Sequence, residues 1–126
     1  KQIFTDSGVS LALAEGIQSW DVHPLILAWL ITAVIRVAVG SATVAGLTTA
    51  GIIAPLVPTL NVDPNLLVLS IGAGSLVFSH FNDGGFWMYK EYFNLSMKDT
   101  FRSWSLMETI VSVMGLIGVL VLAKMI

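Results

Sequence analysis

Residues 34–56 read VIRVAVGSATVAGLTTAGIIAPL, and this stretch decides what kind of protein the chain is. Apolar residues lie on both sides of a polar interruption, Gly40-Ser41-Ala42-Thr43, and one cation, Arg36, precedes it. No charged residue occurs from 37 to 62, a longer run than the about 20 residues that a helix needs to cross a bilayer core. Backbone leaves the helical form at membrane depth only where protein or a water-filled cavity satisfies it. The interruption beside an arginine therefore predicts a functional site.

The amino-acid composition also indicates that most of the chain lies in a membrane. Of the 126 residues, 56% are hydrophobic and 11% are charged, and the mean hydropathy is +0.85. Soluble domains carry about 25% charged residues, so we expect an all-α integral membrane protein. The net charge of −2, with only six basic residues, argues against binding to nucleic acid. The chain has no cysteine, which excludes disulfides and thiolate metal sites. Its two histidines are too few for most histidine-based metal sites, and we expect no cofactor.

The chain begins with lysine, and no signal segment follows. We therefore expect part of a longer protein, with about three to four transmembrane segments. Residues 1–22 are amphipathic and include Asp6 and Glu15, which suit a lipid-facing span poorly. They are expected to form a hairpin arm or an interfacial helix, and an extramembrane linker is the alternative.

The next segment, residues 24–56, is too long for one upright span. As a straight helix it would measure roughly 50 Å at 1.5 Å per residue, whereas the hydrocarbon core is about 30 Å thick. We expect a broken membrane helix with halves near 24–39 and 44–56. The alternative is one long tilted helix whose Ser and Thr hydroxyls bond to its own carbonyls.

Two further spans are expected. Residues 66–87 are predicted to form a membrane helix that runs into a second polar interruption, SHFNDGG at 79–85. Residues 88–104 contain basic side chains, so the positive-inside rule predicts a cytoplasmic connector. Residues 105–126 are expected to form the final membrane helix. Glu108 lies in its first turn, where the helix dipole favours a carboxylate, and a proton carrier is the alternative reading.

Arg36, Ser41 and Thr43 are the first candidate site. A helix that begins near Thr43 would point its amide groups and positive dipole end at the interruption, and such ends bind anions. The guanidinium of Arg36 adds a fixed charge that is matched to a carboxylate. We therefore predict a substrate that bears a carboxylate, although Arg36 could instead snorkel or pair with a carboxylate elsewhere.

His80, Asn82 and Asp83 are the second candidate site. An imidazole and a carboxylate three positions apart can exchange protons, and histidine titrates near neutrality. Asn82 lies between them and can bind hydroxyl groups. The alternative is a solvated helix end at the cytoplasmic interface. No motif of a hydrolase or a metalloenzyme is present, so we expect no enzymatic activity.

The run AVGSATVAGLTTAGIIAPL, followed by GAGSLVFSHFNDGGFWMYKEYFNLS, resembles the C-terminal part of the GntP family of bacterial gluconate permeases, which are gluconate:proton symporters. The resemblance extends over essentially the whole chain. It implies part of an inverted-repeat secondary transporter, multi-pass in the bacterial inner membrane, that imports gluconate or a closely related sugar acid with protons. Permeases for idonate, D-serine or other hydroxy acids in the same group would look alike.

The resemblance also implies partners and roles. The expected partners are a sugar acid, protons, membrane lipid and the N-terminal remainder of the permease, and a homo-oligomer is left open. The Gly40–Thr43 interruption would be the break in the second repeat, and residues 1–17 the end of its hairpin. Gluconate would place its carboxylate at Arg36 or the helix end. Its hydroxyls would meet Ser41, Thr43, Asn82 and Asp83. A non-transporting membrane scaffold and a passive anion channel are the competing readings.

Overall fold

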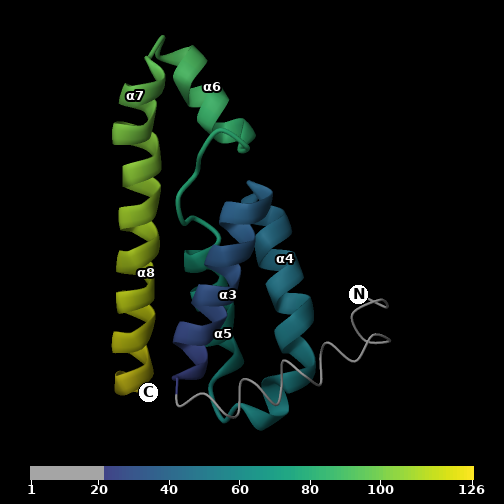
Figure 1. Ribbon diagram of the computed structural model, residues 1–126. Coiled ribbons are helices and arrows are strands. Elements are labelled where there is room, and N and C mark those ends of the chain that lie inside the picture. The colour runs from purple at the N-terminus through teal and green to yellow at the C-terminus, as the bar shows by residue number, and fades with distance from the viewer. Residues whose placement is uncertain (1–21) are drawn as a thin grey trace.

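The computed structural model describes residues 22–126, which are helical and contain no strand. Four helices pack side by side: α3 (Pro24–Val39), α4 (Ala42–Ile53), α5 (Pro64–Gly74) and α8 (Leu106–Met125). Two short helices lie at one end of this group: α6 (Gly84–Tyr92) is tilted above α3 and α4, and α7 (Met97–Thr100) lies in line with α8 (Figure 1). The expected all-α fold is confirmed for the described residues. The expected hairpin arm or interfacial helix at 1–22 lies outside them, apart from Val22.

The helix that was expected to break does so at Gly40 and Ser41. Helix α3 ends there because Gly40 adopts a left-handed conformation (φ +80°), and its N–H donates to the carbonyl of Arg36 at 2.8 Å. Ser41 is extended and accepts a hydrogen bond from the N–H of Val44 at 3.3 Å, which caps the start of α4. The alternative of one long tilted helix is wrong.

The two helices lie side by side, whereas halves of one span would lie end to end. In Figure 1, α4 runs back along α3 and continues into a 3-10 turn at Ala54–Thr59. The left-handed glycine followed by an extended serine turns the chain sharply, so the interruption becomes the tip of a helical hairpin. The expected position of the break was correct, but its geometry was not.

The single helix expected over 66–87 is wrong. Helix α5 ends at Gly74, and residues 75–83 form turns before α6 begins. The non-helical backbone is satisfied from α8: the hydroxyl of Ser105 donates to the carbonyl of Ser79, and the N–H of Phe78 donates to the Thr109 hydroxyl at 3.3 Å. This is the situation that permits irregular backbone at membrane depth.

The boundary expected between a connector at 88–104 and a final helix at 105–126 also differs. Helical structure is continuous from Met97 to Met125, because α7 passes through a π-turn at Phe101–Ser105 into α8. The Ser96 hydroxyl caps this long helix by accepting from the N–H of Asp99 at 3.2 Å. The connector between α6 and α7 is therefore limited to residues 93–96.

Serine hydroxyls and small residues hold α3, α5 and α8 together. The Ser70 hydroxyl donates to the carbonyl of Leu25 at 2.5 Å, and the Ser112 hydroxyl donates to that of Ala73 at 2.5 Å. The indole of Trp29 donates in turn to Ser112 at 3.0 Å. Such hydrogen bonds and small contact residues are how helices associate in lipid, where apolar burial contributes little.

Two helical stretches in the described range are long and apolar enough to cross a membrane, Ala42–Thr59 and Met97–Met125. Pro24–Val39 and Pro64–Gly74 are apolar but shorter. Large apolar side chains on α8 are exposed, among them Ile110, Met114 and Val121. These features are consistent with a segment of a larger membrane protein.

Candidate functional site

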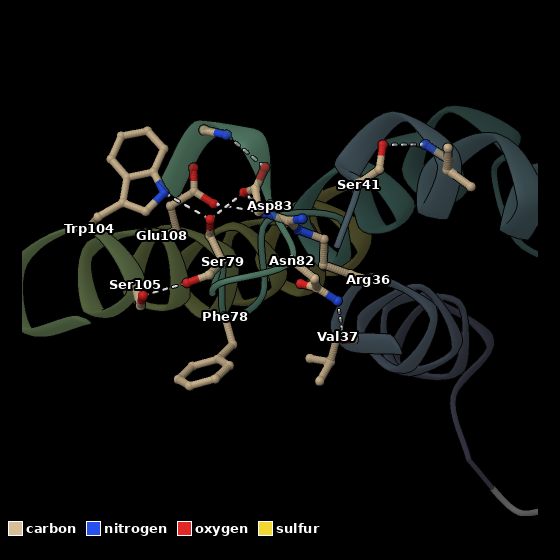
Figure 2. Close-up of polar contacts among 12 residues, drawn as sticks. Arg36, Val37, Ser41, Phe78, Ser79, Asn82, Asp83, Trp104, Ser105 and Glu108 are labelled. Atoms are coloured by element: carbon tan, nitrogen blue, oxygen red, sulfur yellow. Dashed lines mark hydrogen bonds and ion pairs between the residues drawn. The ribbon is translucent and has the colours of Figure 1, made fainter. Parts of the chain in front are cut away.

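A buried arginine meets two carboxylates where α3, the segment before α6, and α8 converge. Arg36 lies in the last turn of α3, and its side chain is 2% exposed. Its Nη2 atom is 2.5 Å from Oδ2 of Asp83 and 3.5 Å from Oε2 of Glu108 (Figure 2). The Asp83 and Glu108 side chains are 17% and 15% exposed. Three residues distant in sequence thus form one largely enclosed ion cluster.

Asp83 is held in this cluster by three donors. Besides Arg36, the Ser79 hydroxyl donates to Oδ2, and the N–H of Gly85 donates to Oδ1 at 3.0 Å. The last of these bonds caps the start of α6. Because charged donors and backbone N–H groups both favour the carboxylate form, the site holds Asp83 as the fixed counter-ion of Arg36.

The π-turn that leads into α8 fixes Ser79 from the other side. The indole N–H of Trp104 donates to the Ser79 hydroxyl at 2.8 Å, and the Ser105 hydroxyl donates to the Ser79 carbonyl. Trp104 and Ser105 belong to the π-turn, a feature that is frequent at functional sites. The chain of contacts runs from Trp104 through Ser79 and Asp83 to Arg36 (Figure 2).

The cluster lies within the length of the long helix rather than at its end. Glu108 follows Met97 by eleven residues and precedes Met125 by seventeen. At 1.5 Å per residue these separations are about 17 Å and about 26 Å along the axis. An ionisable cluster at such a position in a membrane-spanning helix is expected to serve function, because it is costly in lipid.

Several buried polar atoms of this region have no hydrogen-bond partner among the described residues. They are Nε and Nη1 of Arg36, Oε2 of Glu108 and Nδ1 of His80. A buried guanidinium with two free donors can bind a further acceptor, and a carboxylate is the strongest match. Within residues 22–126, no group of three histidine or acidic side chains could hold a metal ion.

The other predicted site residues lie apart from this contact chain. The Asn82 amide donates to the carbonyls of Val37 and Ala38, both at 3.4 Å, and so covers the end of α3. Ser41 is turned toward Val44 of its own helix (Figure 2). Thr43 lines an apolar groove of about 340 Å³ between α4 and α5. None of the hydrogen bonds described for Asn82 and Ser41, nor the groove at Thr43, reaches the Arg36 side chain.

His80 is 8% exposed and lies between two aromatic rings. It stacks on Phe81 with ring centroids 4.9 Å apart, and it meets Phe78 edge-on at 5.6 Å. The alternative of a solvated helix end does not fit this burial. The predicted juxtaposition of His80 with Asp83 takes the form of a backbone turn, in which the N–H of Asp83 donates to the carbonyl of His80 at 2.9 Å.

Sequence reasoning did not assign Glu108, Ser79 or Trp104 to the site. Glu108 was interpreted first as a favourable charge in the first turn of a helix, but the helix begins at Met97. A carboxylate well inside an apolar span would have been the available signal. Ser79 and Trp104 carry no such signal, because their roles depend on contacts between distant segments.

Comparison with known proteins agrees with this picture. Residues 1–126 match the family model described as GntP family permease. The chain is 52% identical over 122 residues to a high-affinity gluconate transporter of Escherichia coli (strain K12), a match covering 97% of this chain and 28% of that protein. It is 48% identical to the Gnt-II system L-idonate transporter of the same organism, over 95% of this chain and 27% of the relative.

A gluconate permease of Bacillus subtilis (strain 168) is 50% identical, with 98% of this chain and 28% of the relative covered. The chain therefore spans little more than a quarter of the length of these relatives. No solved structure matches it. A match over every residue to the family model, together with about 50% identity to several permeases, establishes that the chain belongs to the GntP permease family.

Proposed function

We propose that the complete permease imports gluconate or a closely related sugar acid together with protons across the bacterial inner membrane. The names of the relatives support the substrate class. The observation in this chain that carries the proposal is Arg36, a buried cation with two free donor nitrogens at membrane depth. Such a group suits the single carboxylate of a sugar acid.

The substrate carboxylate is proposed to bind the two donors of Arg36 that Asp83 does not use, Nε and Nη1. These donors are enclosed, so binding requires the segment at 79–83 to shift relative to α3 while Asp83 stays paired with Arg36. Alternating access in a transporter supplies such a movement. Asn82 would then be released from the carbonyls of α3 and could bind substrate hydroxyls. Ser41 and Thr43, at the start of α4, are proposed to contribute further polar contacts.

The residues predicted for proton coupling, His80 and Asp83, lie in one polar segment, and Asp83 is proposed to act there as the counter-ion of Arg36. The Nδ1 atom of His80 is buried and has no hydrogen-bond partner among the described residues, so it can take one when this segment moves. Asp83 sets how much of the Arg36 charge is available to a substrate.

An L-idonate transporter among the relatives favours that sugar acid as the second candidate substrate.

The test is uptake of labelled gluconate by the complete permease in proteoliposomes with an imposed pH gradient. Wild-type protein is expected to accumulate gluconate, to lose accumulation with a protonophore, and to be inhibited by L-idonate more than by D-serine. The Arg36→Ala variant should lose accumulation, whereas Arg102→Ala, which removes an exposed arginine, should retain it. Normal uptake by Arg36→Ala would remove Arg36 from the substrate site, and uptake that ignores the gradient would indicate a passive channel.

A further inference from the structure

Among residues 22–126 the ion cluster contains one cation and two carboxylates, and no second cation there pairs with the second carboxylate. Glu108 is faced by Arg36 from α3 and by Asp83 from the segment before α6. Helices α3 and α5 pack against α8, and apart from Arg36 neither contains an ionisable side chain. With every group ionised, the cluster would therefore have an unbalanced negative charge in a poorly solvated place.

The two carboxylates differ in how they are held. Asp83 accepts from three donors, of which two reach Oδ2 and one reaches Oδ1. Glu108 lies 3.5 Å from the same Nη2 atom of Arg36, and within the described part of the chain its buried Oε2 has no hydrogen-bond donor. A buried anionic oxygen without donors is unfavourable, and binding a proton removes that cost. Glu108 is thus the group of this cluster best suited to take a proton.

Protonation of Glu108 would change what Arg36 can bind. While both carboxylates are ionised, the approach of a third carboxylate is opposed by their charge. Once Glu108 is neutral, the charges of Arg36 and Asp83 balance, and the two free N–H donors of Arg36 can donate to a bound anion at a lower electrostatic cost. Proton binding and anion binding then favour each other, as thermodynamic linkage requires for symport.

We propose that Glu108 is the residue that binds the transported proton, and that its neutral form prepares Arg36 for the carboxylate of the substrate. This proposal rests on the proposed function. It assigns to Asp83 the part of a permanent counter-ion, and it makes Glu108 the coupling residue within the cluster. The ring of His80 packs between Phe78 and Phe81 rather than against Glu108, so His80 lies outside this cluster.

The test uses the complete permease in proteoliposomes and compares two modes of gluconate movement. Accumulation driven by a pH gradient needs proton release, whereas exchange of labelled for unlabelled gluconate does not. Because glutamine imitates the protonated carboxyl group, Glu108→Gln should lose gradient-driven accumulation and retain exchange. Glu91→Gln is the matched control, since the side chain of Glu91 is 73% exposed, and it should retain both modes.

Gluconate binding to detergent-solubilised protein supplies the second measurement. Where one proton must bind with each anion, wild-type affinity should fall about tenfold per pH unit on the alkaline side of the Glu108 titration. The Glu108→Gln variant should bind with an affinity that varies much less over the same range. Glu108→Asp, which retains a titrating group at a different distance from Arg36, should accumulate gluconate but shift the pH midpoint of binding.

Three results would overturn the proposal. One is accumulation by Glu108→Gln equal to that of wild type. Another is loss of gluconate binding at every pH in Glu108→Gln, since the neutral side chain should favour the anion. If that variant cannot be purified, an unchanged pH midpoint in Glu108→Asp decides against Glu108. Failure of the wild-type permease to accumulate any sugar acid with a pH gradient would instead contradict the proposed function.

Discussion

At the scale of single residues, Gly40 meets two structural requirements at once. Its backbone is left-handed, which costs a residue with a side chain about 1–2 kcal/mol. A Cβ atom at this position would also collide with Asn82, whose amide covers the carbonyls at the end of α3. Gly40 therefore sets both the end of α3 and the position of the segment that contains Asp83.

Gly40→Ala is expected to lower the thermal stability of the purified permease and to weaken uptake, because the tip of the hairpin and Asn82 cannot both keep their positions. The destabilisation should exceed the about 1–2 kcal/mol of the backbone term alone. Gly51→Ala in α4 is the control, since no atom lies within 4 Å of an added Cβ there. Alanine favours a helix by up to about 1 kcal/mol over glycine, so this control should be neutral or stabilising. Equal melting temperatures for the two variants would refute the assigned role of Gly40.

The sequence predicted individual site residues only where one residue departs from its local pattern. Arg36 was evident because a cation stands in an apolar run, and its pairing with a carboxylate elsewhere was one of the alternatives. The identity of that carboxylate was not evident, because Asp83 lies 47 positions away and no local rule relates the two. The same limit applies to Ser79 and Trp104, whose hydrogen bond joins residues 25 positions apart.

At the scale of helices, the close approach of α5 to α3 is what aligns the site. Gly74, the last residue of α5, faces the carbonyl oxygen of Trp29 and the side chain of Thr32 on α3. The next polar segment begins directly after this contact and continues to Asp83. The separation of α3 and α5 therefore influences how closely Asp83 can approach Arg36.

Gly74→Ala is expected to reduce both stability and transport, because its Cβ would lie 2.5 Å from the Trp29 oxygen and 2.9 Å from Cβ of Thr32. Overpacking of this kind costs about 1–3 kcal/mol. Gly72→Ala, two residues earlier on the same helix, meets nothing within 4 Å and should leave both properties near wild type. Thermal unfolding and initial uptake rates of the two variants provide the comparison. If Gly72→Ala proved the more damaging, the packing of α5 on α3 would have to be reconsidered.

The end of a helix was predictable from sequence where a particular residue stops it. The direction in which the next helix runs was not. Gly40 marked the end of α3, and the expected end of the second half near 56 falls in the 3-10 turn that directly follows α4. The reversal between α3 and α4 comes from the left-handed Gly40 followed by the extended Ser41, and the apolar pattern of 24–56 does not distinguish such a hairpin from two halves of one span. Similarly, 66–87 is apolar enough for one helix, but hydrogen bonds from α8 make an irregular segment at 75–83 the better arrangement.

At the scale of the whole chain, the two polar interruptions meet at one end of the helix group. The tip of the α3–α4 hairpin and the segment before α6 lie together beneath α6 and α7, while the turn between α4 and α5 lies at the opposite end with the C-terminus (Figure 1). The exposed apolar faces of α4 and α8 require lipid or the remainder of the permease as neighbours. The described segment is thus expected to place its ion cluster between two aqueous sides.

This arrangement predicts which parts of the chain face which side of the membrane. If the basic connector near α6 and α7 is cytoplasmic, Tyr92, which is 84% exposed, should be accessible from the cytoplasm, and Asn65, exposed at the start of α5, from the outside. The chain contains no cysteine, so Tyr92→Cys and Asn65→Cys can each be introduced singly into a permease whose other cysteines have been replaced. A membrane-impermeant thiol reagent added to intact spheroplasts should label Asn65→Cys alone, and disruption of the membrane should expose Tyr92→Cys. Labelling of only Tyr92→Cys in intact spheroplasts would show that the orientation is the reverse of the one proposed. Labelling of both variants would show that the chain between residues 65 and 92 does not cross the membrane. The ion cluster could not then lie on a path across it.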